Sequence, residues 1–91
     1  MIEWVEGHTK WLLEYNSKPF DGHRGYRVVY RERDTGYWVA VYFNDVISSG
    51  RFLNKNCTLA NWSASDDDIR FDTKEEAMAL CERHNRLMIL Q

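Results

Sequence analysis

Hydrophobic and polar residues alternate along residues 26–44 in the pattern of two β-strands joined by a tight turn. β-Branched and aromatic residues fill both halves, and Asp34-Thr35-Gly36 lies between them. If these three residues form a loop with Gly36 in the left-handed conformation, Arg33 pairs with Tyr37. We therefore predict a hairpin of strands 26–33 and 37–44.

The two faces of this hairpin differ in chemistry, because successive side chains of a strand point to opposite faces. One face is nearly all apolar and is predicted to cover the core; it carries Tyr26, Val28, Tyr30, Trp38, Ala40 and Tyr42. The other face mixes guanidinium groups with apolar groups; it carries Arg27, Val29, Arg31, Arg33, Tyr37, Val39, Val41 and Phe43. The pairing of these residues depends on the turn.

A helix is the second clear element, and we predict it at 73–85. Thr73 and Glu76 have the spacing of a capping box, and acidic residues suit the positive end of a helix dipole. An apolar stripe follows at helical spacing; it consists of Ala77, Leu80, Cys81, His84 and Met88. Asn85 is predicted to end the helix in a left-handed turn, and residues 87–90 fit either a last helical turn or a closing strand.

Residues 4–15 fit two patterns. Their larger side chains fall at helical spacing and form one stripe, which consists of Trp4, Val5, His8, Trp11, Leu12 and Tyr15. The competing pattern is a strand from Lys10 to Tyr15, with alternate residues on one face. Gly7 weakens the helix by about 1 kcal/mol relative to alanine. We favour an N-terminal helix and keep the strand as the alternative.

The middle of the chain is less regular. Short apolar pieces occur at 46–47 and 52–53, residues 63–68 are predicted to form an exposed acidic loop, and residues 69–71 fit a short strand. With 91 residues the chain makes one domain. We predict an α+β fold in which a small antiparallel sheet packs on the C-terminal helix.

The composition is sufficient for a core, and the charged residues of opposite sign are concentrated in different segments of the chain. Aromatic residues make up 14% of the chain, which supplies enough large side chains for a core, and the net charge is −2. Residues 24–33 carry four arginines against one glutamate, a local charge of +3, whereas residues 66–76 carry six acids against two bases, a local charge of −4. The N-terminus lacks the basic start and apolar run of a signal peptide, so we expect a cytoplasmic protein.

Motifs for catalysis or for cofactor binding do not occur in the sequence. There is no nucleophile elbow, no phosphate-binding loop and no dinucleotide fingerprint. Cys81 and His84 are three residues apart and could supply two of the four ligands of a zinc site, but a complete site would need Cys57 and a histidine from unrelated segments. We expect no enzyme activity, no metal and no cofactor, and we expect Cys81 to be a small buried hydrophobe.

Two charged surfaces are candidates for binding. The arginines of the hairpin project to one side and lie near aromatic rings, as in surfaces that pair phosphates and stack bases; this candidate nucleic-acid site consists of Arg27, Arg31, Arg33, Tyr37 and Phe43. The acidic segment presents carboxylates of the kind that occupy a basic groove; it consists of Asp66, Asp67, Asp68, Asp72, Glu75 and Glu76. Each surface has a simpler interpretation as a solvated face.

The order of aromatic strands, a polar stretch and Phe71-Asp72-Thr73-Lys74-Glu75-Glu76-Ala77 resembles a pattern of small bacteriophage and mobile-element proteins. In these proteins a curled antiparallel sheet packs on one helix, a layout shared by the DNA-arm-binding domains of tyrosine integrases. The resemblance covers roughly residues 25–86, and this chain departs from the integrase version because its middle is acidic and no catalytic domain follows.

The resemblance implies a stand-alone accessory protein. We expect a non-enzymatic inhibitor or adaptor whose partner is another protein or protein complex, such as a CRISPR complex of the bacterial host, and which uses the acidic segment. The alternative is a small nucleic-acid-binding module that uses the arginine and aromatic face of the hairpin. No membrane partner is expected.

Overall fold

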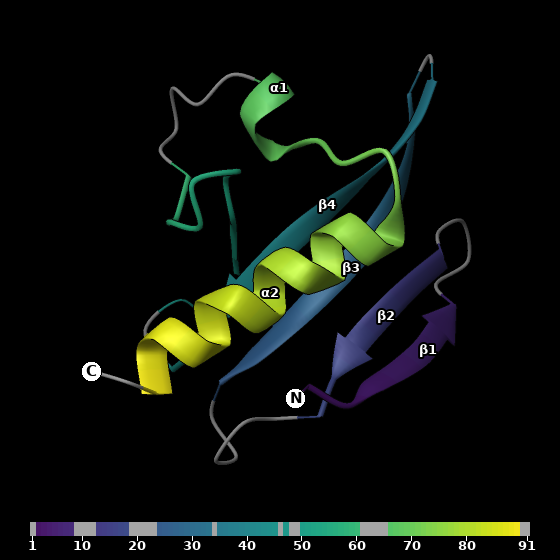
Figure 1. Cartoon of the computed structure of the whole chain (residues 1–91). Helices are drawn as coiled ribbons and strands as arrows, with labels where there is room; N and C mark the ends of the chain where they lie inside the picture. The colour runs from purple at the N-terminus through teal and green to yellow at the C-terminus, as the bar shows by residue number, and fades with distance from the viewer. Residues whose placement is uncertain are drawn as a thin grey trace.

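A computed structural model describes residues 2–8, 13–18, 24–33, 35–45, 47, 50–60 and 66–89. Its strands are β1 (Trp4–His8), β2 (Leu13–Ser17), β3 (Gly25–Arg33), β4 (Thr35–Phe43) and β5 (Arg51–Phe52), and its helices are α1 (Asp66–Ile69) and α2 (Lys74–Ile89). The strands form one antiparallel sheet in the order β1-β2-β3-β4-β5, with α2 lying across one face (Figure 1). This arrangement confirms the predicted α+β fold. Among the described residues, neither helix combines the length and the hydropathy that a membrane crossing requires.

The core lies between α2 and the face of the sheet that was predicted to be apolar. Its buried residues come from the hairpin, the middle segment and the helix; they are Tyr26, Val28, Ala40, Tyr42, Leu53, Cys57, Phe71, Ala77, Leu80 and Cys81. Trp38 is partly buried and packs against this cluster, while Tyr30 lies edge-on to it with ring centroids 5.2 Å apart. Ala40 and Ala77 are both fully buried, and such small side chains let a helix approach a sheet closely.

The register of the hairpin differs from the prediction by two residues. Arg31 pairs with Tyr37 and Arg33 with Thr35, so Thr35 and Gly36 belong to β4 instead of to the loop. A shift of two residues changes every cross-strand partner but leaves each side chain on its predicted face, because the side-chain period of a strand is two. The predicted faces are therefore confirmed, and the predicted pairs are wrong.

The predicted N-terminal helix is wrong. Residues 4–8 and 13–17 form β1 and β2, which pair from Trp4 with Ser17 to His8 with Leu13. Within β1, Trp4 packs against the core while the adjacent Val5 is 48% exposed, so two residues of the supposed helical stripe lie on opposite faces of a sheet. The strand alternative was partly right, because Leu13 and Tyr15 belong to β2; residues 10–12 lie outside the described part.

Asn54 organises the segment that follows β5. Its side-chain oxygen accepts hydrogen bonds from the backbone N–H of Asn56 at 3.0 Å and of Thr58 at 3.1 Å, and its own N–H donates to the carbonyl of Thr58 at 2.9 Å. Cys57 has a φ of 65°, a left-handed conformation that this small loop holds in place. Leu53, just before the loop, is fully buried and donates its N–H to the carbonyl of Ala40.

The helix α2 begins as predicted but ends later. The Thr73 hydroxyl accepts a hydrogen bond from the N–H of Glu76 at 3.2 Å, which confirms the cap. Asn85 does not end the helix: it is buried within it, and α2 continues to Ile89. Residues 87–89 therefore form the last helical turn, since the C-terminal half of α2 still packs on the core through Met88.

Candidate protein-interaction surface

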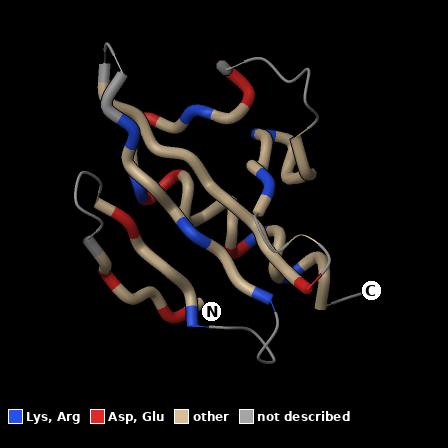
Figure 2. The backbone as a smooth tube through the Cα atoms, turned by 180° about the vertical axis from the view of Figure 1, so that it is seen from behind, with Lys and Arg blue, Asp and Glu red and all other residues tan. Residues whose placement is uncertain are grey.

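The acidic segment forms one end of the molecule. Asp66, Asp67 and Asp68 lie in α1 instead of in the predicted loop, and the chain then runs past Asp72 to the first turn of α2. The exposed acidic residues of this segment are Asp67, Asp68, Asp72, Glu75 and Glu76. The structure does not describe the side chain of Asp66. The acidic positions of α1 and of the chain before α2 lie at the same end of the tube (Figure 2). The structure thus places the exposed acidic residues in α1, before α2 and in the first turn of α2, and we call them the acidic rim: Asp67, Asp68, Asp72, Glu75 and Glu76.

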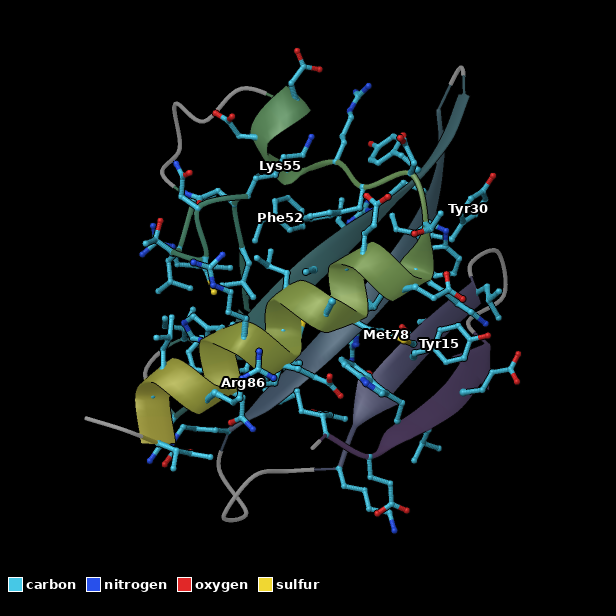
Figure 3. The ribbon with its side chains drawn as sticks, viewed as in Figure 1. Tyr15, Tyr30, Phe52, Lys55, Met78 and Arg86 are labelled. Atoms are coloured by element: carbon cyan, nitrogen blue, oxygen red, sulfur yellow. The ribbon has the colours of Figure 1, made fainter. Side chains whose placement is uncertain are left out.

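Backbone contacts hold this rim on the sheet. Phe71 and Trp38 exchange two backbone hydrogen bonds, with N–O distances of 2.7 and 2.9 Å, in place of the predicted strand at 69–71. The N–H of Lys55 donates to the carbonyl of Asp68 at 2.9 Å, and the side chain of Lys55 lies beside α1 (Figure 3). The carboxylates are therefore carried by a backbone that is anchored at Asp68 and at Phe71.

The two basic residues of the segment contact tyrosine rings of the sheet. The Arg70 guanidinium lies 4.3 Å from the ring centroid of Tyr37. The Lys74 ammonium donates to the hydroxyl of Tyr15 at 3.0 Å, a contact that raises the pKa of Lys74. Figure 3 shows Tyr15 beside Met78, on the sheet side of α2. Both cations thus contact the sheet, while five carboxylates of the segment are exposed.

The predicted nucleic-acid face lies on the opposite side of the sheet from α2. Arg27 and Arg31 are exposed there, and the side chain of Arg33 lies outside the description. Arg70 adds a guanidinium to this face, since its neighbour Phe71 turns into the core while Arg70 covers Tyr37. The ring of Phe43 lies over Gly25, where a Cβ atom would come within 2.5 Å of it.

Arg27 already has partners on that face. Its Nε donates to the Asn16 side-chain oxygen at 2.7 Å and lies 3.6 Å from a carboxylate oxygen of Glu14. The Glu14 side chain is only 14% exposed, so its charge is held close to the guanidinium. Sequence reasoning missed this cluster because it placed Glu14 at the end of a helix, and only the pairing of β2 with β3 brings the two together.

The centre of the same face is apolar and covered. Val29 and Val39 pair across the hairpin, and they are only 6% and 2% exposed although they lie on the face away from α2. Of the two described arginines of β3 on this face, Arg27 is paired with Glu14 and Arg31 is exposed. The acidic rim is the more exposed of the two predicted surfaces.

A third group of polar residues lies in the core. The hydroxyl of Tyr26 is 2.7 Å from Nδ1 of His84, and the His84 ring packs on Tyr42 with centroids 4.9 Å apart. Burial raises the pKa of Tyr26, so its hydroxyl stays protonated, and the tautomer of His84 sets which of the two groups donates. Burial also lowers the pKa of His84. The contact explains why a histidine occupies the apolar stripe of α2.

His84 is expected to make the protein less stable in acid. In the unfolded chain it titrates near pH 6.5, whereas in the fold its pKa is lower, so the unfolded state binds more protons below about pH 6.5. The stabilisation is fully present above that pH and is lost as the pH falls toward the folded pKa. Urea unfolding at pH 7.5 and pH 5 should show a larger loss of stability for the wild type than for His84→Gln. Equal losses would contradict the assignment.

The cysteines do not form a reactive site. Cys57 and Cys81 are free and buried, and burial raises the pKa of both thiols, which disfavours the nucleophilic thiolate. Within the part of the chain that the structure describes, no group of three or more His, Cys, Asp or Glu side chains is placed to hold a metal ion.

Comparisons of this chain with protein-family models, with curated proteins and with solved structures found no match. The assignment of function therefore depends on the surfaces of the molecule itself.

Proposed function

We propose that this protein is a non-enzymatic inhibitor or adaptor that binds another protein through its acidic rim, defined as Asp67, Asp68, Asp72, Glu75 and Glu76. In the form that the resemblance suggests, it is a phage accessory protein that acts in the bacterial cytoplasm. Its target is then a host defence complex whose basic groove normally holds nucleic acid.

The observation that carries the proposal is the exposure of these five carboxylates on an anchored backbone. A groove built for phosphates offers positive potential, which steers an acidic surface toward it. Because Phe71 and Asp68 tie the segment to β4 and to Lys55, little of its order has to be gained on binding. The opposite face is less suited, since Arg27 is paired with Glu14.

Reversal of Asp67 and Asp68 to lysine is expected to remove binding. Charge contacts that are desolvated in an interface cost about 2–5 kcal/mol when one partner is lost, so the loss of two costs about 4–10 kcal/mol, which is comparable with the roughly 8 kcal/mol of a micromolar complex. The wild type would be used to capture its partner from a bacterial lysate, and the affinity of the identified partner would then be measured for each variant. DNA should compete with the wild-type protein for that partner.

The matched control reverses Glu3 and Asp45, which are also exposed but belong to other parts of the molecule. Both double variants change the net charge by the same amount, so a general charge effect would weaken both equally. The proposal is wrong if the Asp67/Asp68 variant binds normally while Arg31→Glu does not, because the hairpin face is then the interface. It is also wrong if DNA and this protein bind the partner together.

The alternative function is a small nucleic-acid-binding module. The observation in its favour is that Arg70 joins Arg27 and Arg31 on the face of the sheet away from α2. Such binding is expected to weaken steeply with salt, and loss of one phosphate contact should reduce the log–log slope by about one. Absence of binding to DNA or RNA at low salt removes this alternative.

A further inference from the structure

The outer face of α2 has an ordered charge pattern. Five exposed residues run from acidic to small to basic: Asp72 before the helix, then Glu76, Ala79, Arg83 and Arg86, while Glu75, Leu87 and Ile89 of α2 are also exposed. Ala79 lies directly opposite the side of the helix that packs on the sheet, because Ala77, Leu80 and Cys81 face the core. In Figure 1 α2 is the layer in front of the sheet, and Figure 3 shows Arg86 on the side of α2 away from it.

Three of the four charges of this face, Asp72, Glu76 and Arg83, lack an opposite charge at the spacing of helix neighbours, whereas Arg86 has Glu82 four residues before it. Side chains three or four residues apart are neighbours on a helix surface, and favourable pairs form at that spacing. No basic residue lies three or four positions from Glu76, and no acidic residue lies three or four positions from Arg83. Glu76 and Arg83 are seven residues apart, which places them about 10 Å from each other along the axis on nearly the same line.

We propose that α2 binds a second copy of this chain in an antiparallel pair, with the two-fold axis at Ala79. In such a pair Glu76 faces the second copy's Arg83, and Asp72 faces the second copy's Arg86. Along one helix, the midpoint between Glu76 and Arg83 lies between Ala79 and Leu80, and the midpoint between Asp72 and Arg86 lies at Ala79. A single two-fold axis can therefore relate the residues of both ion pairs. A two-fold interface repeats each contact, which gives four ion pairs from four residue positions.

The size and the charge of the surface predict a weak dimer. Ala79 at the crossing allows the two helices to approach closely, and Leu87, which is 46% exposed, extends the contact at its edge. A single pair of short helices is nevertheless smaller than a standard interface. Beside these ion pairs, the same two-fold axis places Glu75 opposite the second copy's Glu82, and these two negative charges repel each other. The dimer is therefore expected to dissociate as salt screens the charges.

The test is sedimentation equilibrium of the full chain, with Arg83→Glu, Glu76→Arg and the double variant that carries both changes. Each single variant puts like charges opposite each other twice, and its dimer dissociation constant is expected to rise about tenfold or more. The double variant restores opposite charges across the axis and is expected to regain the wild-type constant. Glu82→Lys replaces a repulsion with an attraction and should tighten the dimer.

The double variant separates this proposal from a local role of the charges. Acids at the start of a helix and bases at its end also stabilise the helix itself through its dipole. That role predicts that the double variant is the least stable of the series by thermal unfolding and does not dimerise better than either single variant. Such a result, or a wild type that stays monomeric at low salt and high concentration, overturns the proposal.

The inference goes beyond the proposed function, and because Asp72 and Glu76 belong to both surfaces, the dimer and the partner compete for these two residues. Asp67 and Asp68 lie in α1, outside the pairs described above, so their reversal should leave dimerisation unchanged while it removes partner binding. Conversely, Arg83→Glu should remove the dimer and leave the carboxylates of the acidic rim available to the partner. If the wild type is monomeric and Arg83→Glu weakens binding of the captured partner, that partner occupies the outer face of α2 and the dimer proposal is wrong.

Discussion

Replacement of Leu53 by alanine is expected to lower the free energy of unfolding by about 2–5 kcal/mol. Leu53 is fully buried between β4 and the segment after β5, and its backbone is fixed by a hydrogen bond to Ala40. Truncation removes buried methyl groups and leaves a cavity that fixed neighbours cannot fill. Chemical denaturation at pH 7.5, followed by tryptophan fluorescence, measures the change.

Leu87 provides a control with the same chemistry. It is 46% exposed in the last turns of α2, so Leu87→Ala removes the same atoms without opening a cavity. Its effect should stay within about 0.5 kcal/mol, as is usual for surface positions. The experiment is best done at a protein concentration too low for self-association. Equal effects of the two substitutions would show that the segment after β5 does not belong to the core.

Replacement of Phe71 by alanine is expected to cost about 3–5 kcal/mol. The Phe71 ring is 6% exposed and packs in the core, while its backbone pairs with Trp38 at the edge of β4. This residue connects α1 to α2, so its loss should also loosen the acidic rim. Amide hydrogen exchange at Asp68 and Asp72 should increase more than exchange in β3.

Phe52→Ala serves as the comparison for this residue. Phe52 pairs with Val41 on the face of the sheet away from α2 and is only partly buried. We expect it to cost less than Phe71→Ala and to leave exchange in the acidic rim unchanged. If both substitutions loosen the rim equally, the rim is held by the stability of the whole domain and not by Phe71.

The two surfaces differ in what a partner would have to displace. On the face away from α2, an incoming phosphate competes with Glu14 and Asn16 for Arg27 and with Tyr37 for Arg70. On the acidic rim, the carboxylates of Asp67 and Asp72 are exposed to solvent. Because a group that is already paired contributes less net free energy to a new contact, we expect Asp67 and Asp72 to contribute more to binding than Arg27 and Arg70.

The sequence by itself determined those features that depend on local chemistry. Alternation with a period of two assigned the faces of the hairpin, and this assignment survives a register change of two residues. The Thr73 cap marked the start of α2, because the hydroxyl bonds to a backbone group only three residues away. The exposure of Asp67 and Asp68 followed from their charge, which is costly to bury.

Only the tertiary structure decided the features that depend on contacts between distant segments. Residues 4–15 have apolar positions that suit a helix, but Trp4–His8 pairs with Leu13–Ser17, which in turn pairs with β3, and this pairing makes the two segments strands. Asn85 is suited to end a helix, yet it is buried and α2 continues past it. The pairing of Arg27 with Glu14 joins residues of two strands, and neither residue signals the other in the sequence. In each case the free energy of a long-range contact exceeded the local preference, which amounts to about 1 kcal/mol or less for each residue.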